Sequence, residues 1–115
     1  MTQAAIDATT FEELKATAGA EFVGELVDTF LAEAPMMLEE LRTSLAAGDA
    51  ELFRRTAHSL KSNASTFGAT ALAGLARDLE LGGLDPVRAA AGASLDAIER
   101  EFTRVAQALT ELKHA

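Results

Sequence analysis

Apolar residues recur at intervals of three or four along most of the chain, the spacing that gives a helix one buried face. Between residues 21 and 47 this apolar stripe comprises Val23, Val27, Phe30, Ala34, Met37, Leu41 and Leu45. Pro35 lies inside the run and is expected to kink the helix, because it lacks a backbone donor. No alternating β-branched or aromatic run flanks a tight-turn dipeptide, so the pattern predicts an all-α protein.

Glycines and capping residues divide the pattern into five predicted helices. Their expected bounds are about 9–18, 21–47, 50–67, 70–81 and 85–113. The first begins at one of two overlapping capping boxes, Thr9 with Glu12 or Thr10 with Glu13. The last begins at Asp85–Pro86, where an N-cap residue precedes a proline at the first helical position.

Four long amphipathic helices joined by short loops predict an antiparallel up-down-up-down four-helix bundle, with the short N-terminal helix across one end. Phe22, Leu31 and Met36 lie off the main stripe of the second helix. Either the short helix covers them, or they belong to an exposed apolar patch of the kind that marks interaction sites. With 115 residues the chain has the size of one domain, so residues 1–115 are expected to form a single bundle.

Composition and charge act mainly by exclusion. The chain has no cysteine, which excludes disulfides, thiolate nucleophiles and cysteine zinc sites. No apolar run has the length of a signal peptide or membrane helix, so a soluble, cytoplasmic protein without a membrane partner is expected. A net charge of -8 and a basic cluster of only four residues argue against nucleic acid as a partner.

The third predicted helix carries a histidine opposite its apolar face. At ~100° per residue on an ideal helix, the core face comprises Phe53, Ala57, Leu60, Ala64 and Phe67. His58 is centred on the opposite face, within about 60° of five small or basic residues: Arg54, Arg55, Lys61, Ser62 and Ser65. The spacing therefore predicts an imidazole clear of the core, although a surface histidine without a chemical role has the same pattern.

Nucleophilic phosphoryl transfer suits such a face. Imidazole is partly neutral near pH 7 and then keeps a nitrogen lone pair. Lys61, one turn on, can neutralise phosphoryl oxygens. Ser62 and Ser65 leave room for another protein and carry hydroxyls that can contact the phosphate. The transfer needs access and charge stabilisation more than acid or base catalysis, so we expect no cofactor on this chain and Mg²⁺ only on the partner.

The segment Ala57–Ser62, followed by Gly68–Ala69 and Leu72, resembles the signature of histidine-containing phosphotransfer (HPt) domains: Ala-His, leucine at +2, lysine at +3 and Gly-Ala at +10 and +11. Residues 30–49, with Ala34–Pro35 and Gly48–Asp49, also resemble the second helix of this family and its following turn. The resemblance covers essentially the whole chain.

This resemblance implies a role for individual residues. His58 would take a phosphoryl group on its outer ring nitrogen from the aspartate of a receiver domain, or from a hybrid kinase, and pass it to a response regulator. Lys61 would be the charge partner, and Gly68 would allow a tight turn. The family usually has glycine where this chain has Ser62, which either narrows the choice of partner or adds a phosphate contact.

Other functions find less support in the sequence. An enzyme needs a second titratable group near His58, and the face of its helix offers only the cations Arg54, Arg55 and Lys61. A kinase needs a Gly-rich phosphate loop after a strand, and no such loop occurs. A metal site in the core needs inward ligands such as Glu-x-x-His, and this spacing occurs only at Glu111 and His114, near the end of the chain.

We therefore expect a monomeric phosphoryl carrier that is not an enzyme. Its partners would be the receiver domains of response regulators and hybrid histidine kinases. The alternative is a helical-bundle adaptor that binds a signalling partner and is never phosphorylated. No role is expected for His114, near the end of the chain.

Overall fold

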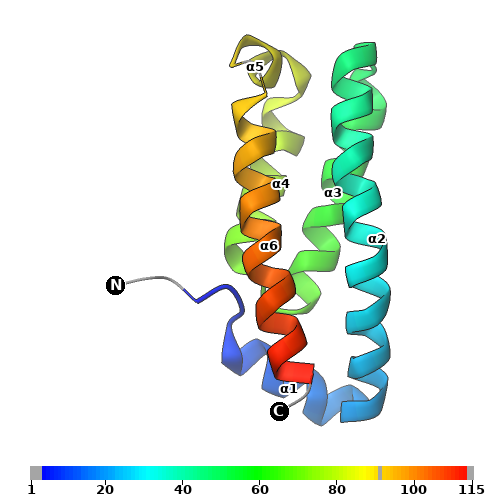
Figure 1. Cartoon of the computed structure of the whole chain (residues 1–115), viewed down its shortest axis with the longest axis vertical. Coiled ribbons are helices and arrows are strands. Elements are labelled where there is room, and N and C mark those ends of the chain that lie inside the picture. Colours follow the sequence, from blue (N-terminus) through cyan, green and yellow to red (C-terminus); the bar gives the residue numbers. More distant parts are fainter. Residues whose placement is uncertain (1–3, 91, 114–115) are drawn as a thin grey trace.

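The computed structural model describes residues 4–90 and 92–113, and within them it contains helices and no strand. The helices are α1 (Ala8–Ala18), α2 (Ala20–Ala47), α3 (Ala50–Thr66), α4 (Thr70–Gly82), α5 (Leu84–Ala89) and α6 (Ala93–Lys113). The four long helices run side by side with alternating direction, α1 crosses one end and α5 lies at the other (Figure 1). The predicted all-α, antiparallel up-down-up-down four-helix bundle is confirmed. Within the described ranges, no helix combines the length and the apolar character needed to cross a membrane.

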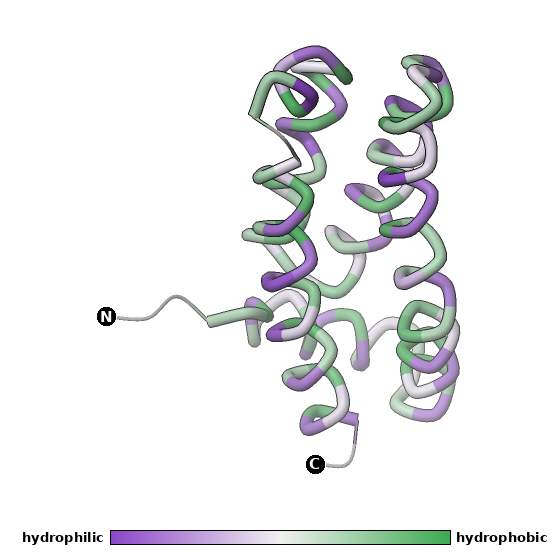
Figure 2. The backbone as a smooth tube through the Cα atoms, turned by 45° about the horizontal axis from the view of Figure 1, so that its top comes forward, coloured by the Kyte–Doolittle hydropathy of each residue, from purple (hydrophilic) through white to green (hydrophobic). Residues whose placement is uncertain are grey.

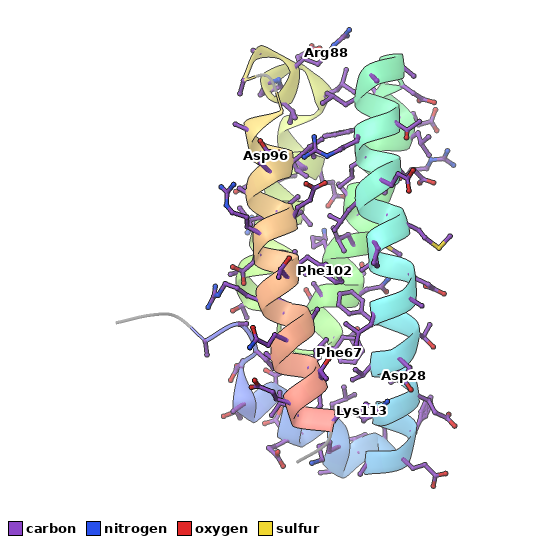
Figure 3. The ribbon with its side chains drawn as sticks, viewed as in Figure 1. Asp28, Phe67, Arg88, Asp96, Phe102 and Lys113 are labelled. Carbon is purple, nitrogen blue, oxygen red and sulfur yellow. The ribbon has the colours of Figure 1, made fainter. Side chains whose placement is uncertain are left out.

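The core lies between the long helices. Figure 2 shows hydrophobic and hydrophilic segments alternating along each of them, as amphipathic helices require. The largest side chains with almost no exposed surface come from α1, α2, α3, α4 and α6, and include Phe11, Leu41, Phe53, Leu72 and Ile98. Phe30 contacts the rings of Phe67 and Phe102, with centroid distances of 5.3 Å and 5.9 Å. Figure 3 labels Phe67 and Phe102.

α1 begins earlier than expected. Asp7, and not Thr9 or Thr10, is the N-cap residue, because its carboxylate accepts hydrogen bonds from the Thr9 amide at 3.1 Å and the Thr10 hydroxyl at 3.0 Å. The two predicted capping boxes are therefore wrong. Asp7, two residues before Thr9, satisfies the free Thr9 amide, and both threonines lie inside the first turn.

Gly68 joins α1 to the turn between α3 and α4. Its carbonyl accepts a hydrogen bond from the Asp7 amide at 2.8 Å. Its φ of +77° favours glycine, and a Cβ there would lie 2.9 Å from Thr10 Cβ and 3.0 Å from the Asp7 carbonyl oxygen. The turn thus needs glycine both for its backbone conformation and for the close approach of α1.

α2 continues without interruption through Pro35 to Ala47, and Gly48, with a left-handed φ of +72°, caps its end. Asp49 then caps α3 by accepting a hydrogen bond from the Leu52 amide at 3.1 Å. The predicted stop and cap are confirmed; the expected kink at Pro35 stays a prediction.

The last predicted helix is two helices, so this prediction is wrong. α5 begins at Leu84, after Gly83, and ends at Ala89. The Gly92 amide then bonds the Val87 carbonyl at 3.0 Å before α6 begins. This break folds α5 over the end of the bundle, where Leu84 and Val87 become buried.

The expectation that α1 covers the off-stripe residues of α2 is wrong for Phe22 and Met36, which remain 46% and 68% exposed. Leu31 is partly buried and packs against the core. The other interpretation, an exposed apolar surface, fits Met36, which lines a hollow between α2 and α3.

Charged side chains tie α6 to α2 near both ends. The Arg42 guanidinium donates from Nε to Glu99 Oε2 at 2.7 Å and from Nη2 to Glu99 Oε1 at 2.8 Å, and also reaches Asp96 Oδ1 at 2.6 Å. At the opposite end, Lys113 Nζ lies 2.5 Å from Asp28 Oδ1 (Figure 3). We call Arg42, Asp96 and Glu99 the Arg42 cluster.

Candidate functional site

The two faces of α3 are those that the sequence predicts. Its core side chains are all buried: Phe53, Ala57, Leu60 and Ala64, with Phe67 directly after the helix. On the opposite face the His58 side chain is 57% exposed. Since α3 is capped at its start and buried along one side, the imidazole is presented from a rigid support.

The predicted neighbours of His58 share its face. Arg54, Arg55, Ser62 and Ser65 are exposed, whereas Lys61 is partly buried, with 30% of its side chain exposed. Arg54 and Arg55 line an open depression of ≈ 390 Å³ together with His58, Ser59 and Glu80. Ser62 and Ser65 do not line this depression. Gly68 lies farther along the chain, in the turn between α3 and α4.

A carboxylate from α4 converges on His58, contrary to expectation. Glu80 Oε2 lies 2.7 Å from His58 Nδ1, and its other oxygen, Oε1, lies 2.8 Å from Lys61 Nζ. The Glu80 side chain is only 17% exposed. The expectation that no carboxylate pairs with the histidine is therefore wrong, because it considered only the residues on the histidine's own helix.

The sequence did contain a signal for Glu80. α3 and α4 form an antiparallel hairpin whose turn, residues 67–69, is centred on Gly68; His58 lies ten residues before Gly68 and Glu80 twelve residues after it. Similar distances from the turn place two residues near the same level of a helical hairpin. Glu80 also follows the buried Leu79, which puts it beside the core face of α4.

The electrostatics of the site fix the role of each ring nitrogen. The hydrogen bond from Lys61, and after it the one from His58, hold the pKa of Glu80 below its ordinary value, against the opposing effect of burial. Glu80 is therefore an anion near neutral pH and can only accept. Nδ1 of His58 is then the donor, which in the neutral ring leaves the lone pair on Nε2.

The arrangement thus resembles a nucleophile with an orienting partner. Glu80 fixes the ring through Nδ1, while the half-exposed side chain keeps Nε2 available. Lys61, Arg54 and Arg55 add positive charge near a group that Nε2 would attack. These features suit the binding and transfer of an anionic phosphoryl group.

The comparisons with known proteins identify the class. The family model described as "Hpt domain" matches residues 25–115. The chain belongs to this family, and the predicted role as a histidine phosphotransfer protein of a phosphorelay is confirmed at the level of the family.

A particular relative agrees with this assignment. The crystal structure of histidine-containing phosphotransfer protein B (HptB) from Pseudomonas aeruginosa PAO1 matches with a TM-score of 0.87 and 31% sequence identity. The match covers 98% of this chain and 97% of that one. Among curated proteins no significant match was found.

Proposed function

We propose that this chain carries a phosphoryl group on Nε2 of His58, taking it from a receiver-domain aspartyl phosphate and passing it to another receiver domain. One observation carries the proposal: Glu80 occupies Nδ1 of a half-exposed imidazole, 2.7 Å away, so that Nε2 is the nitrogen left to react. Membership of the Hpt family supports the same role.

In the proposed step, the Nε2 lone pair attacks the phosphorus of the acyl phosphate in line with the leaving carboxylate oxygen. A P–N bond forms, the P–O bond to the donor aspartate breaks, and that carboxylate leaves with the electron pair. The proton on Nδ1 stays in place, so the ring becomes an imidazolium paired with Glu80. In the forward transfer, an acceptor carboxylate attacks phosphorus and the ring leaves as a neutral imidazole, still protonated on Nδ1.

Glu80 is a positioning residue in this mechanism. It fixes the ring orientation and the tautomer, and its negative charge stabilises the imidazolium that forms when Nε2 is phosphorylated. Since it acts through His58, its loss should slow transfer without altering the site that is labelled.

Lys61 is the charge partner for the phosphoryl oxygens. Its Nζ is already held beside the imidazole, 2.8 Å from Glu80 Oε1. A lysine ammonium is a mobile point charge with three donors, so it can contact a phosphoryl oxygen while it stays near the carboxylate. Arg54 and Arg55 add positive charge around the phosphoryl site. Ser62 and Ser65 have small side chains, so a partner protein can approach the adjoining surface closely.

The chain acts, in this proposal, as a phosphoryl carrier and not as an enzyme with its own kinase or nucleotide site. It needs no cofactor, and Mg²⁺ belongs to the receiver partner, where it neutralises the aspartyl phosphate. Receiver domains of response regulators and hybrid histidine kinases are its partners, and nucleic acid and membranes are not. We propose a cytoplasmic monomer in which residues 1–115 form one domain.

His58→Gln separates this function from that of an adaptor that only binds. Wild-type protein is incubated with a phosphorylated receiver domain, and the acid-labile, base-stable label is mapped by peptide digestion. The variant should bind the receiver but take up no label. Undiminished labelling of the variant would refute the carrier, and a wild-type protein that binds receivers without being labelled would establish the adaptor.

A further inference from the structure

The depression around His58 has cations on one side and a carboxylate on the other. Besides the imidazole, it is lined by Arg54, Arg55 and Ser59 of α3 and by Glu80 of α4. Its volume is ≈ 390 Å³. A water molecule takes about 30 Å³, so a phosphoryl group with its three oxygens fits into the depression beside the ring.

The imidazole leans toward the two arginines. In an α-helix each Cα–Cβ bond tilts toward the N-terminus, so a long side chain covers the preceding turn. Arg54 and Arg55 belong to that turn, because they precede His58 by four and three positions. Glu80 holds Nδ1 at 2.7 Å, so the nitrogen that opens into the depression is Nε2.

Lys61, the cation expected from the sequence, is already paired. Its Nζ lies 2.8 Å from Glu80 Oε1, and it does not line the depression. The hydrogen bonds from Lys61 and His58 lower the pKa of Glu80, which therefore stays ionised and keeps attracting the ammonium. Lys61 must then divide its charge between Glu80 and a phosphoryl group.

Arg54 and Arg55 have no such counter-charge. Within residues 4–90 and 92–113 no ion pair joins a carboxylate to either guanidinium, although the chain has a net charge of -8. Glu80 lines the same depression, but its two oxygens lie beside His58 and Lys61. Unpaired positive charge next to a nucleophile favours an anionic substrate.

The charges of the phosphorylated site call for a further cation. A phosphoryl group carries about two negative charges near neutral pH, and the imidazolium to which it is bonded carries one positive charge. The charges of Glu80 and Lys61 cancel within their ion pair. One negative charge is left, and a single arginine at the depression neutralises it.

We propose that Arg54 is a further catalytic residue, whose guanidinium donates two hydrogen bonds to oxygens of the phosphoryl group on Nε2 of His58. Arg54 lines the depression around His58, whereas Arg55 also lines the hollow between α2 and α3. The planar fork of a guanidinium matches two phosphoryl oxygens, a geometry that the ammonium of Lys61 does not have.

Arg54 makes and breaks no covalent bond in this role. It holds two oxygens and offsets their charge while phosphorus moves between the donor oxygen and Nε2. The proposal rests on the phosphotransfer function and adds the group that binds the transferred phosphoryl.

A phosphodonor without a protein separates phosphoryl binding from partner binding. Phosphoramidate is such a donor: Nε2 attacks its phosphorus, the P–N bond of the donor breaks, and its protonated nitrogen leaves as ammonia with the electron pair. The rate of labelling on His58 is measured for wild type, Arg54→Ala and Arg54→Lys. Arg100→Ala is the matched control, because Arg100 is an exposed arginine of α6 that lines neither hollow beside His58.

Labelling should slow about tenfold for Arg54→Ala and about fivefold for Arg54→Lys, which keeps the charge but loses the fork. The control should stay within about twofold of wild type. Guanidinium ions at a non-denaturing concentration should restore much of the rate of Arg54→Ala, and ammonium ions at the same concentration should not. Melting midpoints should match wild type, because Arg54 is exposed.

A wild-type rate in Arg54→Ala, or full recovery in Arg54→Lys, would overturn the proposal and leave the phosphotransfer function intact. An Arg54→Ala protein that phosphoramidate labels normally but a phosphorylated receiver labels slowly would also overturn it, because Arg54 would then contact the partner and not the phosphoryl group. A wild-type protein that takes no label on His58 from phosphoramidate or from any receiver would instead refute the phosphotransfer function.

Discussion

Arg42 and His58 each reach a carboxylate on a neighbouring helix, but the two clusters leave different groups free. In the Arg42 cluster one cation lies between two carboxylates, Asp96 and Glu99, and both oxygens of Glu99 receive a donor. Around His58 the order is reversed. One carboxylate, that of Glu80, lies between two basic groups, and one of these keeps a ring nitrogen free.

The difference separates a structural contact from a reactive one. Guanidinium is always charged and has no lone pair to offer, so the Arg42 cluster can only hold α2 to α6. Imidazole is largely uncharged at physiological pH and then has one nitrogen with a lone pair. A carboxylate that accepts the Nδ1 proton in a hydrogen bond leaves this lone pair on Nε2. The fold thus uses similar ion pairs twice, once to join helices and once to orient a nucleophile.

Of the variants that distinguish the His58 site from the Arg42 cluster, Glu80→Gln should have the largest effect on phosphoryl transfer. Glutamine keeps the size of the side chain but removes the charge that stabilises an imidazolium, so phosphoryl transfer should slow about 10–100-fold. Single-turnover transfer to a receiver measures this rate; an unchanged rate would mean that Glu80 only joins α3 to α4.

Lys61→Ala should slow transfer about tenfold, because the phosphoryl oxygens lose the cation that is paired with Glu80 beside His58. The fold should tolerate the change, since the Lys61 side chain is 30% exposed and its ion pair is with Glu80, which stays paired with His58. Thermal melting provides the control, and a midpoint lowered by more than about 5 °C would contradict a mainly electrostatic role at the site.

The sequence identifies the α3 half of this site but not the α4 half. His58, Lys61 and the arginines share one helix, so periodicity alone places them on one face. Glu80 meets them only through the α3–α4 hairpin, and a search along one helix cannot find it. Counting residues outward from the turn at Gly68 would have brought Glu80 close to His58, because it compares residues across a turn.

Contacts between distant parts of the chain also explain why two of the predicted helix boundaries are wrong. The alanine-rich segment around residue 90 has a high helix propensity, and only Gly92 marks the break between α5 and α6. What decides the break is tertiary, since it buries Leu84 and Val87 at the end of the bundle. Asp7 likewise caps α1 because the Gly68 turn holds that segment in place.

Arg42→Ala should have the opposite effect from the site variants. Transfer should stay within about twofold of wild type, whereas stability should fall by about 0.5–1 kcal/mol, because the cluster is more than a third exposed and largely solvated. The melting midpoint should drop by about 2–5 °C. A normal melting curve with slowed transfer would show that the Arg42 cluster influences the site.

Acid should weaken both clusters, and this is the smallest effect. The hydrogen bond from Arg42 lowers the pKa of Glu99, just as Lys61 and His58 lower that of Glu80. A carboxylate with a lowered pKa stabilises the fold above its ordinary value, about 4.3 for glutamate, and this contribution is lost as pH falls through the lowered value. Melting of wild type, Glu80→Gln and Glu99→Gln from pH 6 to 3 should show the wild-type advantage shrinking below about pH 4; a constant difference would contradict it.

One nitrogen of one histidine, Nε2 of His58, is proposed to accept the phosphoryl group. Long-range ¹H–¹⁵N NMR of protein with ¹⁵N-labelled histidine, before and after phosphorylation by a receiver domain, tests it most directly. We expect ³¹P coupling at Nε2 of His58, a proton retained on Nδ1, and no change at the other histidine of the chain, His114. Coupling at Nδ1 of His58, or a label on any other residue, would contradict it.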